Sequence, residues 1–433
     1  MLTHMAGFMV ASAALAEPVP DPIAQPIPQV VIDSGITSGH VFNTTADEQV
    51  LFSTVIEEPG APWLRLRFDD VRLDGDAYLR VTSLEDEAVQ FLFREHIRQW
   101  RSTSAYFNGN AVRVELIAGP DEGGHVVIDE VMAGVVGGQR SQCGPTDDRL
   151  PSDDARVGRI MPVTCTAWII DDCNHCLFTA GHCSSQVEVM QFNVPLSDSN
   201  GSINHPPPED QYPVDPTSHQ TNFGQGVGND WAYFGVFPNS NTGLTPAEAQ
   251  GAFFVLTAPV DEPGREIRIT GNGSVPSSVP AEWNYAQKTH VGPLVGVTGT
   301  RVEYQTDTTG GNSGSPIIDE ATNTAIGIHT HGGCSTIAGN LGTSSQLDAL
   351  QAALAAPLGV CAPPLPDFSF PAGRPNIVAP DGSDTFVLEI TATDAIPIPG
   401  TAMLHYDDGS GPVSVALTQT SDNVYDVTFP ASA

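Results

Sequence analysis

The segment Asp307–Pro316 constrains this chain more than any other stretch of the sequence. It reads Asp-Thr-Thr-Gly-Gly-Asn-Ser-Gly-Ser-Pro, so Ser313 has glycines close by on both sides. Because glycine adopts positive φ and allows close backbone approach, such a turn can expose one hydroxyl and aim nearby amides at one point. Glycine- and serine-rich segments also form ordinary surface turns. The segment alone leaves both interpretations open.

Two further segments upstream carry the groups that a reactive serine requires. Leu177–Cys183 reads Leu-Phe-Thr-Ala-Gly-His-Cys and contains His182, and Asp230 lies in the sequence Asn-Asp-Trp-Ala. A serine hydroxyl is a poor nucleophile until a base removes its proton, and that base needs a third group to orient it. The chain supplies histidine, aspartate and serine in that order. The three segments together therefore favour nucleophilic catalysis over a plain turn.

The three segments resemble the catalytic motifs of the chymotrypsin-fold serine proteases. More narrowly, Thr308–Pro316 followed by Ile326–Thr330 resembles the V8-type glutamyl endopeptidases. The likeness extends over residues 143–361, close to half of the chain. It implies two packed six-stranded β-barrels with the three motifs in the cleft between them.

The resemblance also implies a role for each site residue. His182 would be the general base, Asp230 would orient it, and Ser313 would be the nucleophile that forms an acyl-enzyme. The amides of Gly311 and Ser313 would form the oxyanion hole, which holds the negative charge on the attacked carbonyl oxygen. The expected function is a secreted serine endopeptidase acting on proteins or peptides, with no cofactor and no metal. The alternative is an inactive module of the same fold that binds through its flanking domains.

The same resemblance bears on the specificity pocket. Thr308 and His329 match the positions that bind a substrate glutamate, and Thr330 follows as a further pocket residue. A hydroxyl and an imidazole hydrogen-bond a carboxylate better than an ammonium group. Asp307, however, stands where trypsin-like enzymes carry the aspartate that binds arginine or lysine. We expect cleavage after glutamate, with cleavage after arginine or lysine as the alternative.

Activation departs from the trypsin pattern. In trypsin-like zymogens an aspartate just before the serine receives the new N-terminal ammonium, whereas this chain has Asn312 there. That ion pair cannot form, so activation by N-terminal insertion in the trypsin manner is not expected. Residues 137–155 form a polar, glycine- and proline-rich connector of the kind that proteases cut. Processing near Arg140 or Arg149 would convert a zymogen by another route.

Composition and the N-terminus point to an extracellular protein. The 51 acidic residues against 17 basic ones give a net charge of −34, which argues against nucleic acid or an anionic membrane as a partner. The apolar run Met5–Ala13, followed by Ala-Leu-Ala, predicts a signal peptide over residues 1–16, although only His4, and no lysine or arginine, precedes the run. No other apolar run is long enough for a transmembrane helix, which needs about 18 residues.

Short alternating strands predict an all-β chain with three folded parts. Residues 17–140 should form an N-terminal β-sandwich, either a propeptide or an accessory domain, with strands at 63–68, 78–81 and 111–116. Residues 141–361 should form the protease domain, which ends in one helix between Ser345 and Pro357. Residues 362–433 resemble an immunoglobulin- or fibronectin-III-like sandwich that could be truncated.

Two loops carry further expectations. The acidic turn from Asp69 to Asp76 could bind calcium or could simply be solvated. An insertion at 194–228, rich in asparagine, proline, serine and histidine, should form a long surface loop near the cleft. Its histidines are expected to be solvated rather than metal ligands.

Seven cysteines in a secreted chain predict disulfides with one thiol left over. By the resemblance, Cys165 pairs with Cys183 beside His182. Cys173 and Cys176 form a tight C-x-x-C, for which a hairpin disulfide is favoured over a zinc site or a redox pair. The remaining cysteines, left unassigned, are Cys143, Cys334 and Cys361.

Overall fold

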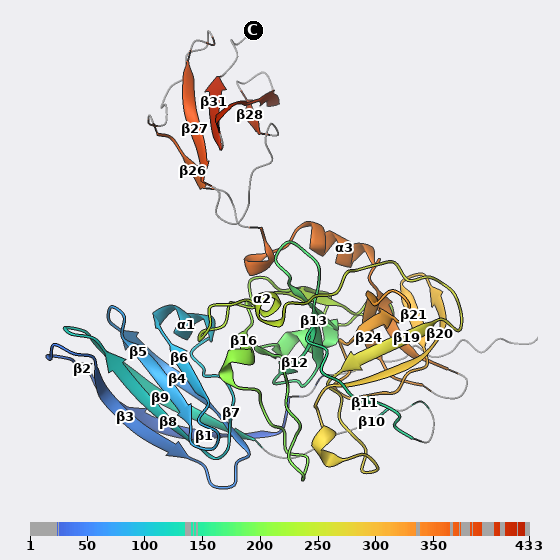
Figure 1. The fold of residues 1–433 in the computed structure, drawn as a ribbon, viewed down its shortest axis with the longest axis horizontal. Helices are drawn as coiled ribbons and strands as arrows, with labels where there is room; N and C mark the ends of the chain where they lie inside the picture. The colour runs from blue at the N-terminus through green and yellow to red at the C-terminus, as the bar shows by residue number, and fades with distance from the viewer. Residues whose placement is uncertain are drawn as a thin grey trace, which may run out of the picture. The chain divides into compact units, whose positions relative to one another are not determined.

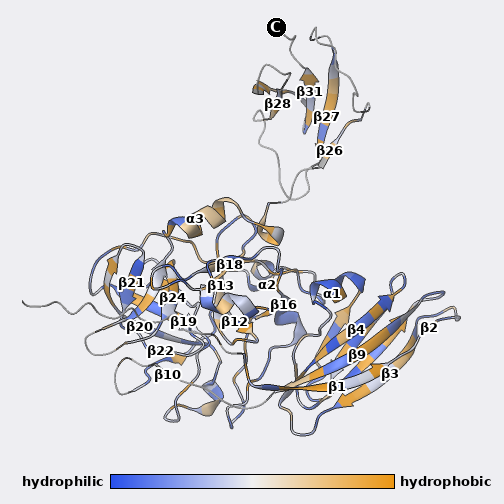
Figure 2. Cartoon of the chain, turned by 180° about the vertical axis from the view of Figure 1, so that it is seen from behind, coloured by the Kyte–Doolittle hydropathy of each residue, from blue (hydrophilic) through white to orange (hydrophobic). Residues whose placement is uncertain are grey.

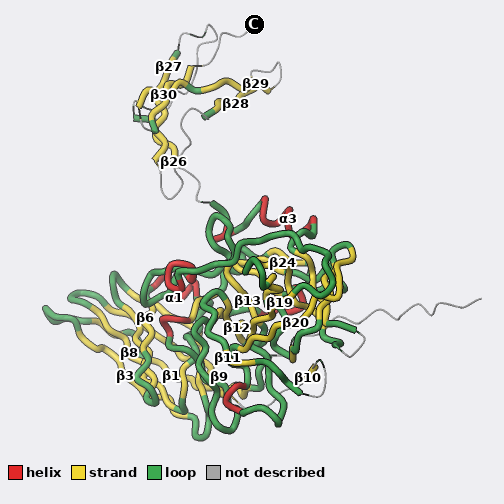
Figure 3. The backbone as a smooth tube through the Cα atoms, turned by 45° about the vertical axis from the view of Figure 1, so that its right-hand side comes forward, coloured by secondary structure: helices red, strands yellow, loops and turns green. Residues whose placement is uncertain are grey.

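The structure is a computed structural model (Figure 1), and it divides the chain into two compact units, Met1–Cys361 and Ala362–Ala433. It describes residues 24, 26–134, 140–141, 143, 146–334, 338–363, 367–371, 373, 382, 384–391, 402–407, 412–421 and 423–428. The signal peptide expected at residues 1–16 lies outside these ranges. Within them, no helix combines the length and apolar character needed to cross a membrane. The chain is all-β, as expected, with strands and loops far outweighing helices (Figure 3).

The larger unit begins with a β-sandwich of two antiparallel sheets. One sheet has the order β1-β9-β4-β7 with β2 paired to β9, and the other has the order β3-β8-β5-β6. The strands are β1 (Gln29–Thr37), β2 (Val41–Phe42), β3 (Gln49–Glu57), β4 (Trp63–Leu73), β5 (Tyr78–Ser83), β6 (Val89–Leu92), β7 (Phe107–Asn108), β8 (Ala111–Ala118) and β9 (Gly123–Gly134). The three strands expected from alternation lie within β4, β5 and β8, so those predictions are confirmed. Figure 2 shows the mixture of apolar and polar residues along these strands.

The first half of the protease region is a half-barrel. Its seven strands are antiparallel neighbours in the order β16-β15-β12-β13-β14-β18-β17. The strands are β12 (Val157–Met161), β13 (Thr166–Ile169), β14 (Leu177–Thr179), β15 (Val189–Gln191), β16 (Gln211–Pro213), β17 (Gln220–Thr221) and β18 (Ala232–Phe234). The first of the two expected barrels is therefore a half-barrel, in which Val214 after β16 bridges Val236 after β18.

The second half is a closed barrel. The order β20-β19-β23-β24-β25-β21 returns to its start, because β20 also pairs with β21. The strands are β19 (Glu266–Gly271), β20 (Lys288–Thr298), β21 (Arg301–Tyr304), β23 (Pro316–Asp319), β24 (Thr324–His331) and β25 (Asn340–Ser344). A half-barrel followed by a closed six-stranded barrel is the chymotrypsin arrangement.

The connector between the sandwich and the half-barrel pairs with the closed barrel. Its two short strands are β10 (Arg140–Ser141) and β11 (Leu150–Pro151). β10 pairs with β22 (Thr308–Thr309), and β11 pairs with β20. The connector therefore lies against the segment that precedes Ser313.

The sandwich and the half-barrel share a core. Met161, Val189 and Ile203 of the protease region are buried in the same apolar cluster as the sandwich side chains. Polar groups also cross the boundary: Nη1 of Arg65 on β4 lies 2.6 Å from Oε2 of Glu188, and the Arg65 side chain is 4% exposed. A continuous core, together with an ion pair from the buried Arg65 to the partly exposed Glu188, makes the sandwich an integral part of the larger unit.

Among the residues that the structure describes, three helices and four 3₁₀ turns complete the larger unit. They are α1 (Arg94–Gln99), α2 (Pro246–Gln250), α3 (Asp348–Ala355), η1 (Gly181–Gln186), η2 (Pro208–Asp210), η3 (Ala281–Trp283) and η4 (Gly359–Cys361). The predicted C-terminal helix is confirmed as α3, although it begins at Asp348 and Ser345 does not cap it. The Ser345 hydroxyl instead donates to the Thr257 carbonyl at 2.7 Å.

The smaller unit contains two antiparallel sheets, ordered β26-β27-β31-β30 and β28-β29. The strands are β26 (Asp367–Ser369), β27 (Thr385–Thr391), β28 (Met403–Asp407), β29 (Pro412–Ala416), β30 (Thr418–Ser421) and β31 (Val424–Thr428). Ile390, Tyr425 and Val427 are buried in it. This agrees with the expected small β-sandwich.

Candidate active site

His182 and Asp230 are brought together by neighbouring strands. β14 leads into η1, which carries His182, and β14 pairs with β18, which follows Asp230. Oδ2 of Asp230 lies 2.6 Å from Nδ1 of His182, and Oδ1 accepts the His182 backbone N–H at 3.1 Å. Gly181 permits this approach, because a Cβ there would lie 2.7 Å from the Trp231 carbonyl oxygen. The fully buried Asp230 carboxylate thus fixes both the ring and the backbone of His182.

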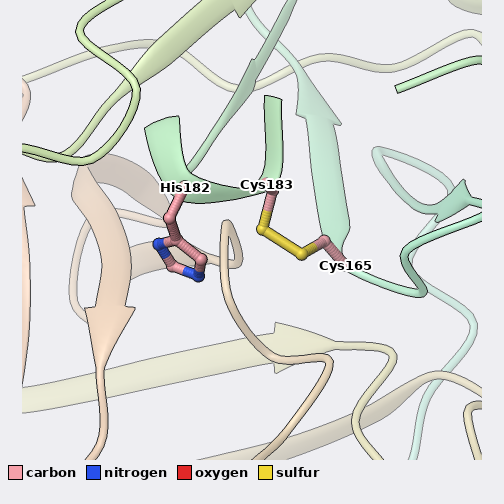
Figure 4. A group of neighbouring side chains, drawn as sticks. All are labelled: Cys165, His182 and Cys183. Carbon is pink, nitrogen blue, oxygen red and sulfur yellow. A yellow bond between two sulfur atoms is a disulfide. The ribbon is translucent and has the colours of Figure 1, made fainter. Parts of the chain in front are cut away.

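The Ser313 loop meets the same strands from the closed barrel. The Thr166 N–H donates to the Ser313 carbonyl oxygen at 2.9 Å. Cys165 precedes Thr166 and forms a disulfide with Cys183, whose Sγ lies 3.9 Å from that same oxygen. Figure 4 shows the His182 ring beside this disulfide. The contacts place the backbone of Ser313 next to the His182 turn, at the junction of half-barrel and barrel.

Gly314 locks the loop in place. Its φ is +88°, and a Cβ there would lie 2.1 Å from the Thr166 carbonyl oxygen, so only glycine fits. Its N–H donates to the His329 carbonyl oxygen on β24 at 2.8 Å. The loop is therefore held between β13 and β24.

The backbone amides around Ser313 divide into two groups. Those of Asn312, Gly314 and Ser315 donate to carbonyl oxygens. Those of Gly311 and Ser313 make no hydrogen bond to any described residue, and Gly311 has φ of +103°. Two unengaged N–H groups flank Asn312 and remain available to a ligand.

His329 and Thr308 are both buried on segments next to the Ser313 loop. Nδ1 of His329 lies 2.6 Å from the Tyr304 hydroxyl. Burial, with smaller contributions from His331 and His182, lowers the pKa of His329 from 6.5 to about 3, so its ring is neutral. Oγ1 of Thr308 is buried and has no hydrogen-bond partner among the described residues. Both side chains can still donate one hydrogen bond.

Thr330 and Asp307 are engaged with the protein itself. The Thr330 hydroxyl donates to the Leu341 carbonyl at 3.3 Å and lies 2.8 Å from Nδ1 of His331. The Asp307 carboxylate accepts the backbone N–H groups of Cys143 at 2.8 Å and Asp148 at 2.7 Å. The Asp307 carboxylate is therefore engaged by backbone N–H groups of the connector.

The disulfides confirm one predicted pair, correct another, and add two pairs that the sequence left unassigned. Cys165–Cys183 is present, whereas the expected Cys173–Cys176 pair is not. Oδ1 of Asp172 accepts the N–H groups of Asn174 and Cys176, which closes this turn without a disulfide. Cys176 points inward and is 4% exposed, whereas Cys173 is an exposed free thiol. The observed long-range pairs are Cys176–Cys361 and Cys143–Cys334.

The connector and the acidic turn also differ from expectation. Arg149 is 2% exposed, so the connector is not an exposed hinge at that residue. Among the described residues, only Cys165, His182 and Cys183 bring three atoms of metal-ligand type within 4.8 Å of one another. Two of these are joined in the disulfide of Figure 4 and cannot act as thiolates. The turn from Asp69 to Asp76 contributes no such group in that part of the chain.

The insertion at 194–228 is largely packed against the protein. His205 is 1% exposed, stacks on Tyr106 with ring centroids 4.6 Å apart, and contacts Trp63 edge-on. Burial lowers the pKa of His205 well below its ordinary value. The expected solvated histidine is therefore a core residue between the sandwich and the half-barrel.

Comparison with known proteins finds a family model that resembles the central region of the chain. Residues 155–347 match the family model described as Trypsin, and no curated protein sequence matches the chain. Among solved structures, a Glu endopeptidase is 16% identical, with a TM-score of 0.37 over 48% of this chain and 98% of its own. A thermostable serine protease from an extremophilic microorganism is 16% identical, with a TM-score of 0.33 over 45% and 92%. Neuropsin from mouse brain is 15% identical, with a TM-score of 0.35 over 47% and 93%. The chain therefore resembles the Trypsin family over residues 155–347, and its half-barrel and closed barrel have the chymotrypsin arrangement.

Proposed function

We propose that this chain is a secreted serine endopeptidase with Ser313 as its nucleophile. The observation that carries the proposal is the 2.6 Å contact between Asp230 and His182 at the Ser313 loop of a trypsin-family domain. In this scheme Nε2 of His182 takes the proton from the Ser313 hydroxyl, while Asp230 holds the tautomer with the proton on Nδ1. Ser313 Oγ forms a bond to the substrate carbonyl carbon, and His182 then returns the proton to the leaving amine. Water releases the acyl group in a second, equivalent cycle.

The charge that develops on the attacked oxygen needs donors that are already in position. The N–H groups of Gly311 and Ser313 are suited to this, because neither is used by a described residue. Loss of a single oxyanion donor typically costs a factor of about 10²–10³ in kcat. The free amides are therefore a substantial part of the proposed mechanism.

Glutamate is the side chain that the pocket accommodates best. With its hydroxyl proton directed to Nδ1, Tyr304 leaves the proton of neutral His329 on Nε2, where it can be donated to a carboxylate. Thr308 offers a second donor that is otherwise unused. Asp307 would be required for arginine or lysine recognition, but its carboxylate is already satisfied by two connector amides. The pocket thus contains two unused hydrogen-bond donors, on His329 and Thr308, and the Asp307 carboxylate is already engaged.

Secretion is supported by the three disulfides. Such bonds persist in oxidising compartments and are rare in the cytosol. The sequence at residues 1–16 has the pattern of a cleaved signal peptide.

The function is tested by incubating the intact chain with a denatured protein of known sequence and mapping every cleavage site by mass spectrometry. The Ser313→Ala variant serves as the control. We expect cleavage after glutamate by the wild type and none by the variant. Cleavage after arginine or lysine would overturn the glutamyl assignment. Absence of cleavage by a folded wild type would favour the inactive binding module instead.

A further inference from the structure

Arg149 is buried beside the Ser313 loop, although it belongs to the connector. It is 2% exposed and directly precedes β11 within that segment. Its guanidinium forms a two-pronged ion pair with Asp147, from Nε at 2.8 Å and from Nη2 at 2.6 Å. The Asp147 side chain is equally buried, at 1% exposure. A buried arginine is stable only with such a partner. The positive charge of Arg149 beside the loop is therefore already balanced by Asp147.

The remaining donors of Arg149 reach the loop itself. Nη1 donates to Oδ1 of Asn312 at 2.9 Å and to Oγ1 of Thr309 at 2.8 Å. Nη2 donates to the Ser274 carbonyl oxygen at 2.7 Å, and the Thr309 hydroxyl donates to that same oxygen at 2.8 Å. The guanidinium thus joins the connector, the loop before Ser313 and the segment after β19.

Asn312 is the residue through which this contact could affect chemistry. Its Oδ1 also accepts the Thr309 N–H at 3.1 Å, and its own N–H donates to the Thr309 carbonyl at 2.9 Å. Asn312 lies between Gly311 and Ser313, whose free amides are the proposed oxyanion donors. The orientation of Asn312 therefore directly sets the peptide plane that carries the Ser313 N–H, and it limits the Gly311 N–H through the one intervening residue.

The charges explain why an asparagine suits this position. Arg149 already has Asp147 as its counterion, so a carboxylate at residue 312 would add an uncompensated buried negative charge. A neutral amide oxygen can accept the remaining guanidinium proton without that cost. The connector is also anchored on both sides of Asp147, by the Cys143–Cys334 disulfide and by the Asp148 N–H on Asp307.

We propose that Arg149 is a positioning residue that holds the oxyanion loop in its working form in the uncleaved chain. This inference rests on the serine protease function proposed above. The guanidinium reaches the loop from within the chain, so no new N-terminus has to be created. The intact chain is then active without a cut between residues 137 and 155.

The chain offers a matched control five residues beyond β11, where Arg156 repeats the same local arrangement. Arg156 donates to Asp154 from Nε at 2.8 Å and from Nη2 at 2.7 Å, as Arg149 does to Asp147. Its guanidinium lies 3.7 Å from the centre of the Phe254 ring and contacts Asn323 rather than the Ser313 loop. Arg149→Ala and Arg156→Ala therefore remove ion pairs of the same local geometry, of which only the more buried Arg149 pair touches the loop.

The experiment measures kcat, KM and the rate of fluorophosphonate labelling for full-length wild type, both alanine variants and Arg149→Lys. N-terminal sequencing verifies that each sample is uncleaved in the connector, and thermal unfolding verifies that each is folded. We expect Arg149→Ala to lower kcat and the labelling rate by about 10- to 100-fold with little change in KM, because Oδ1 of Asn312 loses its charged donor and keeps only the Thr309 N–H. Added guanidinium ion at millimolar concentration should restore part of the loss, and Arg156→Ala should retain the wild-type kcat.

Arg149→Lys keeps the charge but has a single nitrogen, which cannot bridge Asp147 and the loop with the same geometry. It decides the question if the alanine variant does not fold: a folded Arg149→Lys protein with reduced kcat supports the proposal. Wild-type kcat in a folded Arg149 variant, a loss confined to KM, or a wild type that acts only after connector cleavage would overturn it. A wild type that reacts with no fluorophosphonate, cleaved or uncleaved, would instead disprove the proposed function.

Discussion

At the scale of single residues, His329 shows how burial decides chemistry. Its ring is shut away from water, contacts the Tyr304 hydroxyl, and has its pKa lowered to about 3. A neutral ring can donate to a glutamate side chain across the range of pH in which that side chain is ionised. The same burial should lower the free energy of unfolding as the solution becomes acidic.

The specificity prediction concerns His329→Ala. Removal of a donor to a buried carboxylate should lower kcat/KM for glutamate peptides by about 10- to 100-fold, since such bonds contribute roughly 1–3 kcal/mol. The rate of labelling by a small fluorophosphonate should stay near that of the wild type, because that reagent does not use the pocket. Steady-state assays on matched glutamate and glutamine peptides measure the effect. An unchanged glutamate preference in the variant would exclude His329 from the pocket.

The pH prediction follows from the lowered pKa. His329 titrates at about 3 in the folded chain and near 6.5 when unfolded, so between these values only the unfolded chain binds the proton. Stability should therefore fall as the pH drops below 6.5, by about 1.4 kcal/mol per pH unit from this residue. Urea unfolding of wild type and His329→Gln from pH 7.5 to 4.5 should show a steeper loss for the wild type. Parallel curves would refute the assignment.

At the scale of elements, the contact between β4 and Glu188, which directly precedes β15, joins the sandwich to the half-barrel. Arg65 donates to Glu188, to the Thr103 hydroxyl and to the Ser104 carbonyl, and its guanidinium lies 4.8 Å from the centre of the Tyr106 ring. We predict that Glu188→Leu destabilises the larger unit by about 1–3 kcal/mol, because it removes the partly exposed carboxylate that pairs with the buried guanidinium. Chemical denaturation measures this. The exposed pair of Arg72 and Asp70 on the same strand is the control, and Asp70→Leu should cost under about 1 kcal/mol.

Local elements were the part of this structure that the sequence could predict. Alternation marked β4, β5 and β8, and the spacing of leucines marked α3, because periodicity depends only on neighbouring residues. Pairings over long separations were beyond reach: Cys143–Cys334 spans 191 residues and Cys176–Cys361 spans 185. Arg149 was interpreted as a cleavage site for the same reason. Its hydrogen-bond partners Thr309, Asn312 and Ser274 lie more than 120 positions away in the chain. Sequence alone also gave no sign that Asp307 would be occupied by connector amides.

At the scale of the whole molecule, the sandwich and the protease region behave as one body. Met161, Val189 and Ile203 complete the sandwich core, and the Ile27 N–H donates to the Pro162 carbonyl at 2.7 Å. We predict that a chain cut between residues 135 and 139, at an inserted recognition sequence for a specific protease, keeps both pieces together. Native gel filtration followed by a denaturing gel should show them in one peak. A protease region that elutes alone would mean that the sandwich is a releasable propeptide.

The central claim is that Ser313 is a nucleophile activated by His182 and Asp230. The most direct measurement is peptide mapping of the intact chain after reaction with a biotinylated fluorophosphonate, beside Ser313→Ala and His182→Ala. A single adduct on Ser313 is predicted for the wild type, with none on Ser313→Ala and a labelling rate at least about 100-fold lower for His182→Ala, in line with general-base catalysis. An unlabelled but folded wild type, or an adduct on any other serine, would contradict the account.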